Sequence, residues 1–127
     1  MKNIFFFLLV LVIFPLLGPA SNIKKNDQDS ILSIKLQKDG IAAGLLGDFE
    51  LALNNFEKLY TLRQKMFGQN SVRLASPLIN IGIQYKNLGN IDKAIESYKK
   101  AEFLCLNNFG DNNLMLGTVY VNLGNVY

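Results

Sequence analysis

The amino-acid sequence predicts an all-α protein built from antiparallel helix pairs that repeat along the chain and stack. The first observation is a short sequence motif that recurs at a fixed spacing: Gly47-Asp48-Phe49 and Gly89-Asn90-Ile91 lie 42 residues apart (89 − 47). The second is a spacing of three and four between apolar residues, without the alternation that is typical of strands. A period of this length indicates stacked supersecondary units, which serve as scaffolds that hold other molecules.

Further landmarks keep the same offset of 42 residues. They are the pairs Ala52/Ala94, Phe56/Tyr98 and Gly68/Gly110, and the phrase Asn80-Ile81-Gly82 with Tyr85, which returns as Asn122-Leu123-Gly124 with Tyr127. Separate landmarks would rarely share one period by chance. We therefore predict a degenerate first unit at 31–70, a second unit at 71–113, and an incomplete third unit at 114–127 that holds only a first helix.

The N-terminus has the pattern of a signal peptide over residues 1–20. Lys2 provides a positive start, an apolar run follows, and small residues flank Pro19 ahead of cleavage before Ser21. This predicts export to the periplasm or the extracellular space. The alternative is a membrane anchor over residues 4–17, although a spanning helix usually needs ~20 residues. Residues 21–30 are polar and are predicted to form a flexible linker.

In the first unit, one helix is expected over residues 31–46 and a second from Asp48 to about Phe67. The apolar stripe of the second helix consists of Phe49, Ala52, Leu53, Phe56 and Leu59. Asp39 stands where the second unit has the apolar Ile81. A polar residue is expected there because an end repeat has one face without a neighbour.

The second unit carries the clearest start and stop signals. Ser76 is expected to cap its first helix, with Pro77 at the first helical position. Gly89 should end that helix, and Asn90 should cap the next one. Two apolar stripes follow from the spacing: Leu74, Leu78, Ile81, Tyr85 and Leu88, then Ile91, Ala94, Ile95, Tyr98, Ala101 and Cys105.

Small residues predict how the helices pack. Gly82 and Ala94 are expected where the paired helices approach most closely, while Tyr85 and Tyr98 should fill the space between neighbouring pairs. Cys105 falls on the same helical face as Tyr98, and we expect it to be a buried structural thiol.

Composition argues against several classes of function. The chain has no histidine and a single cysteine, which excludes an intramolecular disulfide and a cysteine–histidine catalytic pair. Removal of Lys2 with residues 1–20 leaves 12 Lys and Arg against 10 Asp and Glu, a net charge of +2. These charges are scattered and do not form a nucleic-acid footprint. We expect no enzymatic activity, no cofactor and no metal.

The repeat resembles the tetratricopeptide repeat (TPR), whose units normally have about 34 residues. The second unit supplies the residues of that pattern: Leu78, Ile81-Gly82, Tyr85, Ala94, Tyr98 and Ala101. The longer period, with Asn80 and Asn122 at corresponding places, resembles the kinesin-light-chain-like subclass and the N-terminal part of an exported bacterial TPR protein. The resemblance implies a right-handed superhelix, an α-solenoid, whose first helices line a concave groove.

In the family this groove binds peptides or partner helices, so the resemblance implies a protein or peptide partner. The groove residues expected here are Ser76, Ile79, Asn80, Ile83, Lys86, Asn87, Thr118, Val121, Asn122 and Asn125. Asparagine amides offer both a donor and an acceptor, which suits a peptide backbone.

Two functional hypotheses follow from these patterns. The first is a non-catalytic interaction scaffold. The alternative is the N-terminal sensing region of a larger enzyme, such as a caspase-like peptidase or a sensor kinase. Because stable arrays usually need three or more units, we also expect weak cooperativity or self-association through an exposed end formed by Leu116, Tyr120 and Leu123. Contact with a membrane is expected only through the uncleaved N-terminal segment.

Overall fold

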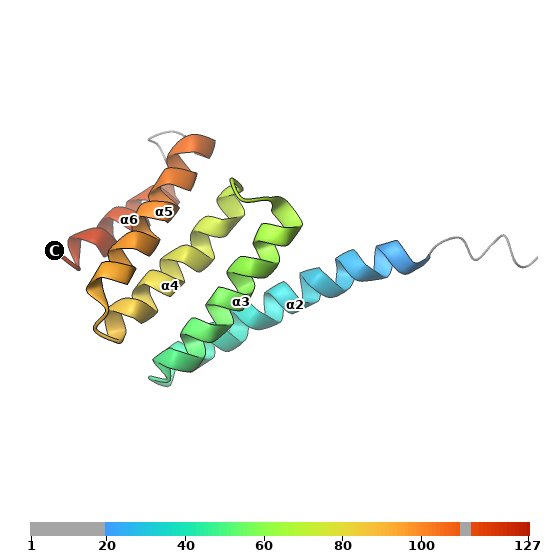
Figure 1. The fold of residues 1–127 in the computed structure, drawn as a ribbon, viewed down its shortest axis with the longest axis horizontal. Coiled ribbons are helices and arrows are strands. Elements are labelled where there is room, and N and C mark those ends of the chain that lie inside the picture. Colours follow the sequence, from blue (N-terminus) through green and yellow to red (C-terminus); the bar gives the residue numbers. More distant parts are fainter. Residues whose placement is uncertain (1–19, 110–112) are drawn as a thin grey trace, which may run out of the picture. The chain divides into compact units, whose positions relative to one another are not determined.

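The computed structural model describes residues 20–109 and 113–127, and within these ranges the protein is all-α, as predicted (Figure 1). The elements are α2 (Ala20–Leu45), α3 (Phe49–Phe67), the short 3-10 helix η2 (Val72–Leu74), α4 (Ala75–Asn87), α5 (Ile91–Phe109) and α6 (Leu114–Gly124). Residues 31–127 form one compact unit. Residues 1–19 of the predicted signal peptide, and the whole of the alternative anchor at 4–17, lie outside the described residues.

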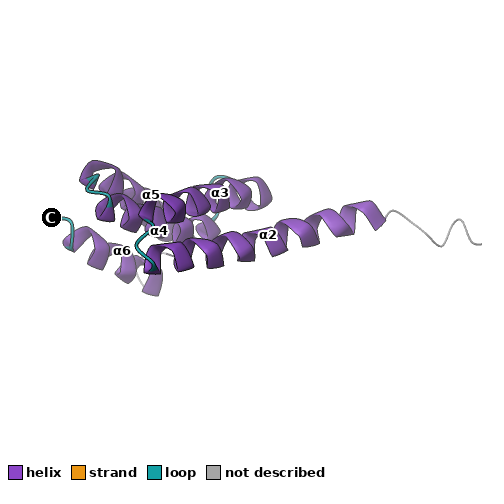
Figure 2. Cartoon of the chain, turned by 90° about the horizontal axis from the view of Figure 1, so that it is seen from below, coloured by secondary structure: helices purple, strands orange, loops and turns teal. Residues whose placement is uncertain are grey.

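Within residues 31–127 the helices form two layers (Figure 2). One layer contains α3 and α5, and the other contains α4, α6 and the part of α2 that belongs to this unit. Consecutive helices are antiparallel because short turns connect them. No helix in the described ranges combines the length and apolar character that crossing a membrane requires.

Glycines end the helices where the sequence predicted. Gly47, Gly68 and Gly89 have φ angles of 81°, 88° and 79°, a left-handed conformation that side chains with a Cβ disfavour. The following helices are capped as expected. Asp48 accepts a hydrogen bond at 3.1 Å from the backbone N–H of Leu51, and Asn90 accepts one at 3.3 Å from Lys93.

The structure differs from the predicted linker, because residues 21–30 belong to α2, which begins at Ala20. This segment contains no glycine or proline that would end a helix. Lys25 and Asp29 also stand four residues apart with opposite charges, a spacing that favours a helix. Extending a helix that is already nucleated fixes one residue per added hydrogen bond, so the polar composition did not prevent it.

The start of α4 also differs from the prediction that Ser76 caps it. The helix begins at Ala75, directly after η2, and Ser76 lies inside its first turn. The capping side chain belongs to Ser71, which accepts a hydrogen bond at 3.3 Å from the backbone N–H of Arg73 at the start of η2. Pro77 remains within the first turn, where its missing N–H needs no partner.

In both helix pairs, α2–α3 and α4–α5, an aromatic ring of the second helix packs directly against a glycine of the first. A Cβ added at Gly82 would lie 2.4 Å from Cε1 of Tyr98, and one at Gly40 would lie 2.9 Å from Cε1 of Phe56. The close approach predicted at Gly82 is therefore confirmed. The ring of Tyr98 lies against Gly82 of its own pair, whereas the sequence predicted only a role between neighbouring pairs.

Contacts between the pairs involve Tyr85, as expected. Its hydroxyl donates a hydrogen bond at 3.1 Å to Oε1 of Glu57 and so joins α4 to α3. Cys105 is fully buried in the same core as Tyr98, and burial raises the pKa of its thiol. The prediction of a buried cysteine is confirmed.

The end predicted to be exposed is largely packed. Leu116 is only 2% exposed and belongs to the core cluster, while Leu123 is partly buried against the same cluster. The prediction for Leu116 is wrong because α6 packs on α5 and α4 through the face that carries Leu116 and Val119. Tyr120 is 49% exposed.

Arg63 on α3 joins three segments of the fold. Its guanidinium donates hydrogen bonds to Oε1 of Gln37 at 2.6 Å, to Oγ of Ser33 at 3.3 Å and to the carbonyl oxygen of Arg73 at 3.2 Å. The planar fork of five N–H donors allows one side chain to reach α2 and η2 together.

Replacing Arg63 with methionine keeps much of the stem and removes these three bonds. We expect the free energy of unfolding to fall by about 1.5–3 kcal/mol, the range for hydrogen bonds to charged groups. Amide hydrogen exchange should accelerate in α2 more than in α5. An equal change in both helices would contradict a local role for Arg63, and Lys65→Met on the same helix provides the control.

Candidate functional site

A cleft of about 490 Å³ lies between α4 and the start of α6. Its lining residues come from α4 and from the segment that begins α6: Ser76, Ile79, Asn80, Ile83, Asn113, Leu114, Met115 and Thr118. Asn113 caps α6, because its Oδ1 accepts a hydrogen bond at 2.8 Å from the backbone N–H of Met115. This bond fixes the position at which the helix begins. The cleft belongs to the layer that contains the first helix of each unit.

The structure brings together part of the groove predicted from the sequence. Ser76, Ile79, Asn80, Ile83 and Thr118 line the cleft. The remaining predicted residues are not among its lining: Lys86, Asn87, Val121, Asn122 and Asn125. They lie toward the C-terminal ends of α4 and α6, whereas the cleft opens near the N-terminal ends of these helices.

Leu114 and Met115 line the cleft but were missed by the sequence reasoning. Leu114 is 93% exposed, and Met115 is partly buried against the core. An exposed apolar residue directly after a capping asparagine was the available signal. It was overlooked because the 42-residue offset places Leu114 opposite Val72, which lies in η2 rather than in α4.

Two asparagines of the predicted groove each donate one side-chain hydrogen bond to their own helix. Nδ2 of Asn80 donates to the carbonyl oxygen of Ser76 at 3.1 Å, and Nδ2 of Asn122 donates to that of Thr118 at 2.9 Å. An asparagine amide has two N–H hydrogens and an acceptor oxygen. These internal bonds therefore orient the amides and leave Oδ1 available to accept a hydrogen bond from a ligand.

The lining of the cleft carries no formal charge, since it consists of serine, asparagine, threonine and apolar side chains. Its apolar walls come from Ile79, Ile83 and Met115. This arrangement suits an uncharged peptide segment with an apolar side chain better than a phosphate or a carboxylate, which needs cationic partners.

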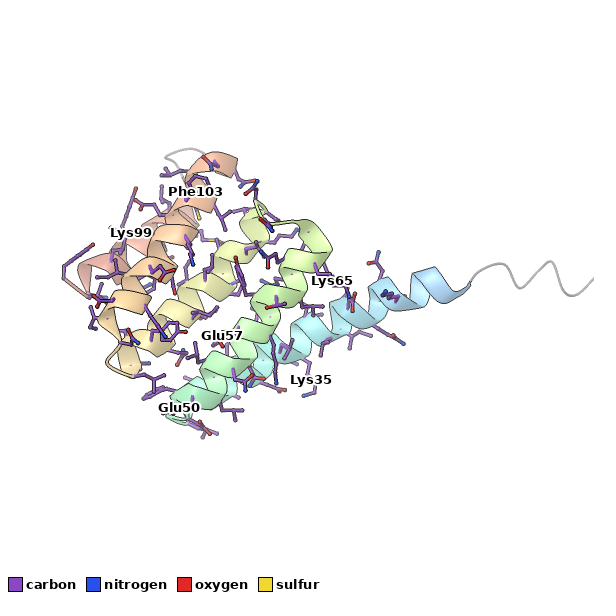
Figure 3. All side chains as sticks on the ribbon, viewed as in Figure 1. Lys35, Glu50, Glu57, Lys65, Lys99 and Phe103 are labelled. Atoms are coloured by element: carbon purple, nitrogen blue, oxygen red, sulfur yellow. The ribbon has the colours of Figure 1, made fainter. Side chains whose placement is uncertain are left out.

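A second cleft, of about 470 Å³, lies on the layer of α3 and α5 and was not predicted. Tyr60, Leu78 and Leu104 contribute apolar surface to it, and Lys99 and Lys100 contribute positive charge. Figure 3 shows Lys99 and Phe103 on α5, and Phe103 is 58% exposed. The sequence reasoning treated Lys99 and Lys100 as a solvated helix face. Lys100 lies 2.7 Å from Oε1 of Glu96, a partner that already balances part of this charge.

The similarity of this chain to known proteins lies in the α4–α5 helix pair. A family model of the tetratricopeptide repeat matches residues 75–102. Residues 75–102 carry a TPR. The match includes the Gly82–Tyr98 contact and most of both helices. A comparison with curated proteins gives no match. The TPR assignment therefore rests on this one unit, and α2 and α3 share its glycine–aromatic contact.

Proposed function

We propose that the chain is a non-catalytic interaction module that binds a peptide segment of a partner protein in the α4–α6 cleft. The observation that supports this proposal is the position of an uncharged, partly apolar cleft beside a TPR. A TPR suggests protein partners in general. The cleft volume falls within the range of about 300–1,000 Å³ that is common for binding pockets.

The contacts available suit an extended peptide. Oδ1 of Asn80 can accept a hydrogen bond from a peptide N–H, and Ile79 and Ile83 can contact one apolar side chain of the peptide. Leu114, which is 93% exposed, would lose much of its contact with water when the peptide binds. Burial of this apolar surface would favour association by about 25 cal/mol per Å² before the entropy cost of binding is subtracted.

The proposal also covers how the helix pairs stack and where the protein acts. We infer that the helix pairs stack as a right-handed superhelix, that α2, α4 and α6 face its concave side, and that the protein acts after export. The common 42-residue offset supports regular stacking, and the composition of residues 1–20 supports export. The alternative, a regulatory region of a larger enzyme, would use the same cleft.

Peptides selected from a random display library against the full chain provide the test. Thr118→Arg places a long charged side chain in the cleft, and we expect the affinity for the selected peptides to fall at least tenfold, or about 1.4 kcal/mol. Asn80→Ala should weaken binding while leaving the helix content unchanged, and Asn122→Ala is expected to do the same if the peptide extends along α6.

Thr61→Arg is the matched control. Thr61 and Thr118 are both exposed, and the hydroxyl of each donates to the carbonyl oxygen four residues earlier. Thr61 lies on α3, outside the lining of the cleft. Equal affinity for the original chain and the Thr118→Arg variant would contradict the assignment of the cleft.

A further inference from the structure

The only two arginines of the chain, Arg63 and Arg73, lie side by side in the fold. Nη1 of Arg63 on α3 is 3.2 Å from the carbonyl oxygen of Arg73 in η2. Burial lowers the pKa of Arg63, and the nearby positive charge of Arg73 lowers it further. Two like charges at close range destabilise the folded chain unless an opposite charge offsets their repulsion.

No carboxylate of the described residues offsets these two charges. The ion pairs found in this part of the chain join a lysine to an acidic residue of the same helix, and neither arginine takes part. The three acceptors of the Arg63 guanidinium are neutral: the hydroxyl of Ser33, the amide of Gln37 and a backbone carbonyl. A partly buried charge is normally paired with an opposite charge. The counter-charge of this arginine pair is therefore missing.

The same positions one repeat later show that the helix packing does not need these polar groups. At the common offset of 42 residues, Ser33, Gln37, Arg63 and Arg73 correspond to Ala75, Ile79, Cys105 and Met115. The first three of these counterparts are buried in one core cluster, and Met115 packs against it. An apolar cluster thus takes the place of the hydrogen-bonded one. We therefore attribute to the arginines a role other than stabilising the repeat.

The cluster keeps several hydrogen-bond donors for a ligand. A guanidinium has five N–H hydrogens, and Arg63 uses three of them. Gln37 accepts with Oε1, which leaves both hydrogens of its Nε2 able to donate. Arg73 is exposed, and its Cζ lies 4.4 Å from the centroid of the Phe67 ring, a cation–π contact that holds the guanidinium but supplies no negative charge.

We propose that Arg63, Arg73 and Gln37 form a binding site for a phosphate group, either a free phosphate anion or the phosphorylated side chain of a partner peptide. Guanidinium groups bind phosphate oxygens through paired N–H donors. A phosphate monoester carries a charge of about −1.5 to −2 at pH 7, which balances both arginines, whereas a carboxylate balances only one. None of these three residues lines the α4–α6 cleft, so the site is independent of the proposed function.

Titration of the isotope-labelled full chain with inorganic phosphate at constant ionic strength, followed by NMR, tests the site. The two arginines give two side-chain Nε–Hε signals, and we expect both to shift along one saturable curve. Arg73→Gln keeps the backbone carbonyl that Arg63 contacts, but it should weaken phosphate binding about tenfold or more. Lys65→Gln removes the same charge from an exposed position on α3 and should leave the affinity unchanged (Figure 3).

Gln37→Glu separates loss of binding from loss of folding. The new carboxylate can accept the bond from Nη2 of Arg63 that Oε1 of Gln37 accepts at 2.6 Å, and it supplies the missing negative charge. We expect the phosphate affinity to fall about tenfold or more. The midpoint of urea unfolding without phosphate should stay the same or rise. A lower midpoint would mean that the cluster does not lack an anion and would overturn the proposal.

N-acetyl-phosphoserine amide, titrated in the same way, distinguishes the two sources of the phosphate group. A higher affinity than that of inorganic phosphate supports a phosphorylated partner peptide, and an equal or lower affinity supports a free anion. Three results would overturn the phosphate site itself. They are the absence of a saturable shift with either probe, equal phosphate affinity of the original chain and Arg73→Gln, and binding of acetate as tight as that of phosphate.

Discussion

Replacing Gly82 with alanine is expected to lower the free energy of unfolding by about 1–3 kcal/mol, the usual cost of overpacking a core. The added Cβ would lie 2.4 Å from Cε1 of the fully buried Tyr98 ring, so the ring or the helix must move. At Gly124 the same change should instead be neutral or stabilise by up to about 1 kcal/mol. No atom lies within 4 Å there, and alanine favours a helix more than glycine does.

Urea denaturation of the two variants measures this difference, and Gly40→Ala provides an intermediate case because the nearest ring atom would lie 2.9 Å away. The account predicts that Gly82→Ala is the least stable of the three and Gly124→Ala the most stable. If Gly82→Ala were as stable as the original chain, the glycine–aromatic contact would not hold the helix pair together.

Truncation of Tyr98 to alanine is expected to cost about 3–5 kcal/mol, the usual range for removing a buried aromatic side chain. The whole ring is inaccessible to water and packs in the core that α4, α5 and α6 share. Because small domains are stable by only about 5–15 kcal/mol, we expect the thermal transition to broaden and shift strongly downward.

Tyr98→Phe separates packing from hydrogen bonding. The hydroxyl of Tyr98 is buried and lacks a hydrogen-bond partner in the described part of the chain. Leaving such a group unpaired costs about 1–3 kcal/mol. We therefore expect Tyr98→Phe, which reproduces Phe56 of the first unit, to be at least as stable as the original chain. A loss as large as that of Tyr98→Ala would contradict the importance of the ring.

Alkaline titration provides a further readout for Tyr98. Burial raises its pKa from 10.0 to about 12. Between these values the unfolded chain releases the phenolic proton while the folded chain keeps it, so the folded state binds more protons. The contribution is complete below pH 10 and is lost as the pH rises toward 12. This part of the alkaline destabilisation should disappear in Tyr98→Phe.

Most of the fold could be predicted from the sequence because local signals and the repeat agree. Gly47 and Gly89 end helices, and Asp48 and Asn90 cap the next ones, so propensity and packing favour the same boundaries. The segment 21–30 was mispredicted because its polar composition resembles a linker, while a continuous helix depends on the neighbouring residues.

The candidate site was predicted in part, for a physical reason. Residues such as Ser76 and Ile79 share one helical face, and the repeat places Thr118 on the equivalent face. The extent of the cleft depends on how α6 packs against α4 and on where the helix begins. Neither can be read from spacing alone, so Leu114 was missed and Leu116 was placed on the surface.

The most direct test of the proposed function is to locate a bound peptide by NMR on the full chain. A library-selected peptide is titrated into the isotope-labelled protein while the amide signals are followed. The account predicts the largest shifts at Ile79, Ile83 and Thr118, with little change at Lys58 and Thr61 on α3. Shifts concentrated on α3 and α5, with the α4–α6 cleft unaffected, would contradict it.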